Sequence, residues 1–446
     1  MIDAAYPCVD GRRAAWLVRA DDGGADDGGA DDGGAQVVTA ASVAVPIAVG
    51  TLDAGVLATV GATGAVTPSG GGTIDWWVVA EDRVHRPADE ASTRQRLVDD
   101  VPVVETSVRV PGGDLVATAY AVAGSRPLVV IELDNRSPAA VAVAFSRPVV
   151  ADRALHAPPA GAGLPDGSVL VPVGHRASVR VAVLDGGPVT SVLAGLASPA
   201  RVVRGWQAQA AVGPHLVLPD ELAPLLVRAR CVALLGRTHA GGGTDDRDDA
   251  ENLVAAGIAL GRGDRIADEA VPELAAAIER LARGHRRAAE MPWLDALALD
   301  AAAVVLAGAG EHRAADDVRA TIARLPPPGR LPDAAPVEGG PFAVVAWLTA
   351  QLVRPVGGGV QLLAGADRSW LGRPVEAHGV PTARGTVGVA VRWHGDRPAL
   401  LWSCDGAPAP GAPRLTVPAL DPSWSTTEPR GDALLAVPPM ALMIGG

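Results

Sequence analysis

The chain contains no lysine, since all 38 of its basic residues are arginine. A Walker A phosphate site, a pyridoxal Schiff base and a protein-kinase site each require a lysine ammonium group, so these three functions are excluded. The motifs H-E-x-x-H, G-x-S-x-G and a G-x-G-x-x-G placed between a strand and a helix are also absent. The use of Arg in place of Lys, together with the excess of Ala, Gly and Val, indicates a GC-rich genome, as in many bacteria.

Cysteine is scarce, and Cys8, Cys231 and Cys404 show no C-x-x-C spacing, so neither a disulfide framework nor a thiolate metal site is predicted. The nine histidines have no zinc-ligand spacing, and we expect no metal and no cofactor. The formal net charge of −12 argues against a nucleic-acid partner. Because no apolar run reaches about 18 residues and no secretory signal begins the chain, we expect a cytoplasmic protein without membrane contact.

The first 200 residues read as short strands separated by turns, the pattern of an antiparallel β-sandwich. Apolar residues alternate over 104–110 and 116–122, on either side of the turn Pro111-Gly112-Gly113-Asp114. They alternate again over 129–133 and 141–145, around a turn at 134–138. Each pair predicts a β-hairpin.

Residues 21–35 repeat Asp-Asp-Gly-Gly-Ala three times. A Gly-rich acidic segment with no apolar side chain larger than Ala cannot form a core, so we expect a flexible loop. Calcium binding is the alternative, although no Glu closes a twelve-residue EF-hand loop.

From Asp220 onward the apolar residues recur with helical spacing. The first helix is predicted from the N-cap Asp220 and the apolar positions that run from Leu222 to Val232. Five more helices are predicted over 251–260, 269–283, 293–307, 311–325 and 342–353. Short loops between six helices make three αα-hairpins.

The segment 360–395 reads as antiparallel β structure. Val387, Val389, Val391 and Trp393 alternate between Gly385 and Gly395, which predicts a half-buried strand with Trp393 in the core.

This segment resembles the C-terminal β region of the six-hairpin glycosidase superfamily. The matching positions, in order, are Leu362, Leu363, Trp370, Gly372, Val375, Gly379, Arg384, Gly385 and Trp393. Two prolines of the family motif are replaced by Ala364 and Asp367. The resemblance therefore supports a similar architecture more than a similar activity.

The resemblance implies a β-supersandwich, a helical α/α toroid and a C-terminal β region. We therefore expect a multidomain α and β protein with an N-terminal antiparallel β-sandwich over 1–200 and a linker over 201–219. An αα-hairpin region follows over 220–355 and an antiparallel β region over 356–446. A complete toroid has twelve helices, whereas the six expected here make a partial one.

Glycoside hydrolysis needs two carboxyl groups on either side of the scissile bond. The loop 244–251 concentrates five carboxylates, among them Asp245, Asp248 and Asp249, and Glu338 precedes the last expected helix. These four are the candidate catalytic residues. Carboxylates at helix starts also act as caps and complement the helix dipole, and this alternative stays open.

Ten Trp dominate an aromatic set with only two Phe and two Tyr. Sugar rings stack on exposed indoles, so Trp76, Trp77 and Trp293 are the candidate substrate-binding residues, with a core role as the alternative. Neighbours on a strand face opposite ways, so one of Trp76 and Trp77 is expected to be exposed.

Two functional interpretations remain. In the first, which we favour because the toroid is truncated, the protein is a catalytically degenerate relative that binds an intracellular glycan or serves in assembly. In the second it is an active glycoside hydrolase using general acid/base carboxylates. The expected partner is a carbohydrate, with a homo-oligomer or a protein partner also open.

Overall fold

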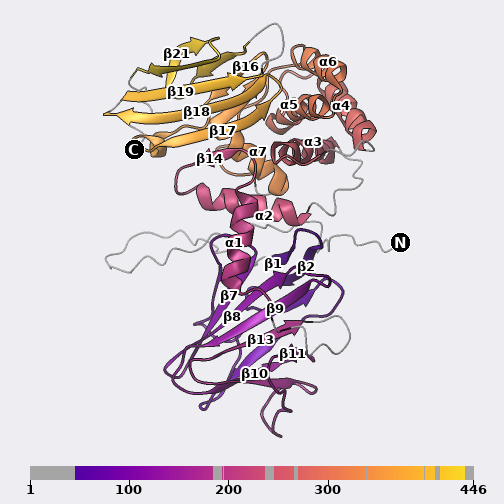
Figure 1. The fold of residues 1–446 in the computed structure, drawn as a ribbon, viewed down its shortest axis with the longest axis vertical. Helices are drawn as coiled ribbons and strands as arrows, with labels where there is room; N and C mark the ends of the chain where they lie inside the picture. Colours follow the sequence, from indigo (N-terminus) through magenta and orange to yellow (C-terminus); the bar gives the residue numbers. More distant parts are fainter. Residues whose placement is uncertain are drawn as a thin grey trace, which may run out of the picture. The chain divides into compact units, whose positions relative to one another are not determined.

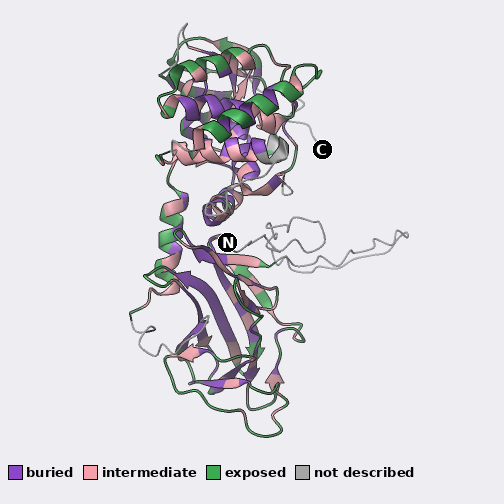
Figure 2. Ribbon diagram, turned by 90° about the vertical axis from the view of Figure 1, so that its right-hand side faces the viewer, coloured by how far each residue is buried: buried purple, intermediate pink, exposed green. Residues whose placement is uncertain are grey.

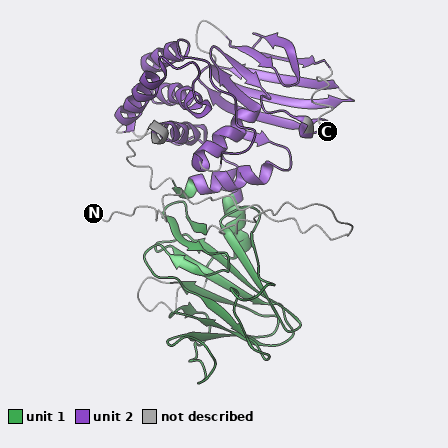
Figure 3. Cartoon of the chain, turned by 180° about the vertical axis from the view of Figure 1, so that it is seen from behind, with its two compact units in different colours: residues 1–206, 234–238 green, residues 207–233, 239–446 purple. Residues whose placement is uncertain are grey.

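The computed structural model describes residues 46–183, 193, 195–236, 246–265, 270–336, 339–395, 397–406 and 412–436, without the side chains of 246–248 and 368. The described residues form helices and several antiparallel sheets, which confirms the mixed α and β class. The chain divides into two compact units (Figure 3). Unit 1 contains residues 1–206 and 234–238, and unit 2 contains residues 207–233 and 239–446. The repeat at 21–35 lies outside the described residues.

Unit 1 is built from three sheets (Figure 1). The first contains β1 (Ile47–Thr51), β2 (Gly55–Val60) and β3 (Val66–Pro68). The second has the order β12 (Val169–Val173), β10 (Val141–Phe145), β4 (Trp76–Val79) and β5 (Val84–His85). The third has the order β11 (Val150–Ala151), β13 (Ser178–Val183), β9 (Leu128–Asn135), β8 (Gly113–Val122), β7 (Val103–Val110) and β6 (Arg94–Leu97).

Side chains from all three sheets meet in one apolar cluster, so the sheets are sandwich-like. Figure 2 marks the buried residues along these strands in purple. Val49 comes from β1, Phe145 from β10 and Ile131 from β9, and each is nearly inaccessible to solvent. β-Branched side chains, mostly Val, dominate the cluster, as suits pleated surfaces that pack face to face.

The β7–β8 hairpin is confirmed, since the two strands pair from Val103 and Tyr120 to Val110 and Gly113. The second predicted hairpin is wrong, because β9 pairs with β8 and β13 whereas β10 pairs with β4 and β12. The chain changes sheets at the buried Asn135, whose side-chain amide donates to the carbonyls of Ala139 and Gly174 at 2.8 and 3.0 Å. Alternation predicts strands but not their partners.

The six helices expected from Asp220 onward are present. They are α2 (Ala223–Gly236), α3 (Asp246–Gly261), α4 (Val271–His285), α5 (Trp293–Gly308), α6 (His312–Ile322) and α7 (Gly340–Leu352). The expected linker differs, because it begins with a further helix, α1 (Pro199–Ala210), before the short strand β14 (His215–Val217). Buried Val203, Trp206 and Ala210 recur on α1 at i, i+3 and i+7, the spacing of one helical face.

Within unit 2, α3 to α6 pack around an apolar core rich in Ala and Leu. The helices α3, α5 and α7 contact β17 of the neighbouring sheet, so helices lie against one side of the strands (Figure 1). Small side chains allow the close helix contacts: a Cβ at Gly257 of α3 would lie 2.8 Å from Ala301 Cβ of α5.

Two sheets complete unit 2. One has the order β14, β17 (Val375–Thr382), β18 (Gly385–His394), β19 (Arg397–Asp405) and β22 (Arg430–Leu434). The other has the order β15 (Val353–Val356), β16 (Gly359–Leu362), β20 (Arg414–Val417) and β21 (Asp421–Thr426). Val387, Val389 and Val391 are buried on β18 as predicted. Trp393 is not, because it stands at the strand end, where its ring is partly exposed and its Nε1–H donates to the Arg373 carbonyl at 2.9 Å.

Candidate functional site

The paired tryptophans at the start of β4 point in opposite directions, as adjacent residues of a strand do. Trp76 is 2% exposed, and its Nε1–H donates to the Gly64 carbonyl at 3.0 Å, so its indole belongs to the core of unit 1. Trp77 is partly exposed. Of the two candidates on β4, Trp77 is therefore the one with a ring surface that a ligand can contact.

A small surface pocket lies beside this pair. It is lined by Thr63, Ala65, Asp75, Trp76, Trp77, Pro87 and Ala88. Its volume of about 30 Å³ holds roughly one water-sized group, so it is too small to enclose a ligand ring.

The polar lining of the pocket suits a hydroxyl group. Asp75 is exposed, and its backbone is fixed because its N–H donates to Ser146 Oγ and its carbonyl accepts from Ser146 N–H, both at 2.9 Å. The Asp75 carboxylate accepts hydrogen bonds, and the Thr63 hydroxyl can donate or accept.

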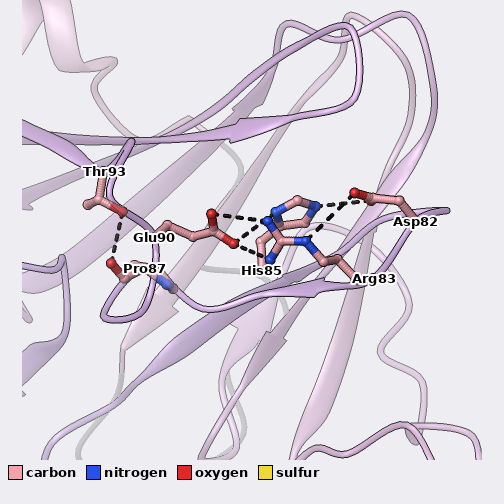
Figure 4. A network of polar contacts seen from close by, with 6 residues as sticks. All are labelled: Asp82, Arg83, His85, Pro87, Glu90 and Thr93. Carbon is pink, nitrogen blue, oxygen red and sulfur yellow. Dashed lines mark hydrogen bonds and ion pairs between the residues drawn. The ribbon is translucent and has the colours of Figure 1, made fainter.

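The opposite part of the lining, Pro87 and Ala88, belongs to the connection between β5 and β6, which a polar network holds (Figure 4). Glu90 bonds to His85 and, as an ion pair, to Arg83. The Thr93 hydroxyl donates to the Pro87 carbonyl at 2.8 Å. Sequence reasoning missed this network, because its bonded pairs stand five to seven residues apart with no recognised motif.

Trp293, the third aromatic candidate, is the first residue of α5 in unit 2 and is partly exposed. The structure places it in a different unit from Trp76 and Trp77.

Of the acidic candidates, Asp248 and Asp249 lie in the first turn of α3 rather than in a loop. Asp249 is 2% exposed, and its two carboxylate oxygens each accept a 2.6 Å hydrogen bond from Arg280 of α4. This bidentate pair joins α3 to α4 and directs the lone pairs of Asp249 toward the guanidinium. Asp248 belongs to α3, but its side chain is not described, and Asp245 and Glu338 lie outside the described residues.

Glu251 brings the two acidic regions close together. It stands in the first turns of α3, and a Cβ at Gly340 would lie 3.3 Å from its Oε2 atom. Gly340 begins α7, two residues after Glu338, and has a φ of +78°, which favours glycine. The first turns of α3 and the start of α7 are therefore neighbours.

A further carboxyl group that sequence reasoning missed is Asp300 on α5, which is 8% exposed. Its Oδ2 accepts the Ala383 N–H at 3.1 Å, at the turn between β17 and β18. Burial raises the pKa of Asp300 to about 7, although that hydrogen bond and the nearby Arg384 and Arg319 lower it. The sequence does carry a signal for it, since an aspartate among the Ala and Leu residues of a helix indicates a buried carboxyl group.

Within the described ranges, no group of three or more His, Cys, Asp and Glu is arranged to hold a metal ion. None of the helices described there is long and apolar enough to cross a membrane. Comparison with known proteins adds no relative, since no protein-family model, no curated protein and no solved structure matches this chain.

Proposed function

We propose that this protein is a glycosidase-like carbohydrate-binding protein without hydrolytic activity, and that Trp77 is its sugar-stacking surface. The observation that carries the proposal is the partly exposed Trp77 beside Asp75 and Thr63 in one pocket. A sugar presents an apolar ring face together with hydroxyl groups, and an indole next to a carboxylate and a hydroxyl complements both. The overall acidic charge fits a neutral glycan better than an anionic one.

The burial and the hydrogen bonds of Asp249 support the absence of hydrolytic activity. A general acid or base must reach the substrate within hydrogen-bond distance. Asp249 is buried and both of its oxygens are bonded to Arg280, so its interactions are those of a structural ion pair. The resemblance to the glycosidase superfamily, together with six helices where a complete toroid has twelve, points the same way.

The proposal is tested by calorimetric titration of neutral oligosaccharides into the wild type, Trp77→Ala and Trp77→Phe. We expect Trp77→Ala to weaken binding about tenfold, since loss of an aromatic stack costs about 1.4 kcal/mol, and Trp77→Phe to retain most of the affinity. Trp293→Ala is the matched control, because it removes a partly exposed indole from unit 2. Binding that depends on Trp293 and not on Trp77 would contradict the proposal.

A second candidate function, an active glycoside hydrolase, is favoured by the position of the Glu251 carboxylate beside Gly340 at the start of α7. Glu338→Gln and Glu251→Gln keep the side-chain shape but cannot transfer a proton, so turnover abolished by either change with binding intact would establish this alternative. A protein with neither turnover nor sugar binding would instead have an assembly role.

A further inference from the structure

One wall of the Trp77 pocket comes from the connection between β5 and β6 rather than from a strand. Pro87 and Ala88 supply that wall. The connection is braced at Glu90, which follows Ala88 by two residues and bonds back to His85 at the end of β5. The brace is local, so the position of this wall depends on a few side chains.

His85 is the buried centre of the brace (Figure 4). It is 3% exposed, its Nδ1 lies 3.1 Å from Glu90 Oε1, and its Nε2 lies 3.0 Å from Asp82 Oδ1. An ionised carboxylate only accepts hydrogen bonds, whereas a neutral imidazole has only one N–H. Both bonds therefore form together when His85 is an imidazolium with a proton on each nitrogen.

The surroundings of His85 keep both carboxylates ionised. The hydrogen bond from His85 lowers the pKa of Asp82, and the hydrogen bond from Arg83 lowers the pKa of Glu90. The charged groups bonded to His85 are Asp82 and Glu90, and Arg83 lies against both carboxylates. The residue paired with His85 on β4 is Val78, which carries no charge.

Loss of one proton from His85 would leave a ring nitrogen lone pair facing a carboxylate. Such a buried, unmatched contact is costly, so the carboxylate would move away from the ring. Of the two carboxylate residues, Glu90 is the one linked to the pocket wall. Its backbone carbonyl accepts the Thr93 N–H at 3.0 Å, and the Thr93 hydroxyl donates to the Pro87 carbonyl.

We propose that His85, as an imidazolium held between Asp82 and Glu90, is a positioning residue that sets the Pro87 and Ala88 wall and makes ligand binding at Trp77 depend on pH. The inference rests on the proposed function of Trp77 as the sugar-stacking residue. The pocket is formed while His85 carries both protons, and it loosens when the pH rises far enough to remove one of them.

The test combines NMR with binding, using the full chain labelled with ¹⁵N at His and Ala. The two ring nitrogens of His85 report its protonation, and the Ala88 amide reports the wall. We expect the Ala88 signal to shift with the same midpoint as the His85 ring, and sugar affinity to fall several-fold over that pH interval. In His85→Gln the side-chain amide keeps one hydrogen-bond donor group but does not titrate. The sugar affinity of this variant should therefore be low and independent of pH.

The outcomes separate this inference from the proposed function. Sugar binding that is equally strong across the His85 titration, or an Ala88 signal that does not follow it, would overturn the inference while leaving Trp77 as the binding residue. If no sugar binds at any pH, the proposed function fails, yet coupled His85 and Ala88 titrations would still support the positioning role. Should His85→Gln not fold, the wild-type titration alone decides.

Discussion

At the residue scale, Asp300 shows how one buried carboxyl group ties two elements of unit 2 together. Its Oδ2 accepts the Ala383 N–H, and the Ala383 carbonyl accepts from Arg319 Nε of α6 at 2.8 Å. A single residue at the β17–β18 turn, Ala383, is thereby held through its N–H by α5 and through its carbonyl by α6. Its burial raises the pKa of Asp300 from 3.8 to about 7, so the group gains a proton in the folded state at a pH where an unfolded chain has lost it.

This pKa gives a stability prediction. Between about pH 4 and 7 the folded protein binds one more proton at Asp300 than the unfolded chain, so the free energy of unfolding falls as the pH rises through this interval. The full effect is at most about 4 kcal/mol, from roughly 1.4 kcal/mol per pH unit. Urea unfolding at several pH values should show this decline in the wild type and a shallower one in Asp300→Asn.

The matched control for that experiment is Asp333→Asn, which changes an aspartate whose side chain is 81% exposed. It should follow the wild-type pH profile. If Asp300→Asn also follows it, the buried Asp300 is not the titrating group and the decline in stability has another source.

The position of Trp393 leads to a second prediction at this scale. Because the ring is partly exposed, Trp393→Ala should cost about 1–2 kcal/mol, less than the roughly 3–5 kcal/mol of a fully buried aromatic residue. Trp393→Phe keeps part of the packing but loses the bond to the Arg373 carbonyl, and should cost about 1 kcal/mol. Thermal unfolding of both variants checks this, and a loss as large as that of a core Trp would contradict the observed exposure.

At the scale of elements, the helices α2 to α7 were predictable because their apolar spacing repeats over ten or more residues, as from Leu222 to Val232. α1 was missed because the resemblance suggested a linker there, although Val203, Trp206 and Ala210 already carried a helical period. The hairpin predicted between β9 and β10 was wrong, because the two strands belong to different sheets. The chain leaves one sheet for the other at the buried Asn135, whose amide bonds to the carbonyls of Ala139 and Gly174, and such tertiary contacts are not encoded in alternation.

The Asp249–Arg280 pair gives a prediction about the contact between α3 and α4. Arg280→Ala leaves a buried carboxylate without its partner and should cost about 2–3 kcal/mol, somewhat reduced because the Arg280 side chain is 42% exposed. The double variant Asp249→Ala with Arg280→Ala should be less destabilised than the sum of the single ones. Arg283→Ala, which affects only an exposed pair with Glu279, should be near neutral in the same denaturation experiment. Additive losses would show that the two side chains do not interact.

At the scale of the whole molecule, composition and alternation predicted a mixed chain with sandwich-like sheets, and the described residues agree. The candidate site was only partly predictable. Adjacent Trp76 and Trp77 signalled that one indole would be exposed, but Thr63 and Pro87 join Trp77 only through tertiary structure. The same holds for Asp249, since nothing in the acidic loop indicates that Arg280, 31 residues later, bonds to one particular carboxylate.

The central claim is that the protein binds a glycan at Trp77 without hydrolysing it. The most direct measurement incubates the wild type with a panel of neutral oligosaccharides and follows equilibrium binding and released reducing ends in the same mixtures. We predict saturable binding of at least one oligosaccharide, weakened about tenfold in Trp77→Ala, with no product above the protein-free control. Product released by the wild type and lost in Glu338→Gln would contradict the claim.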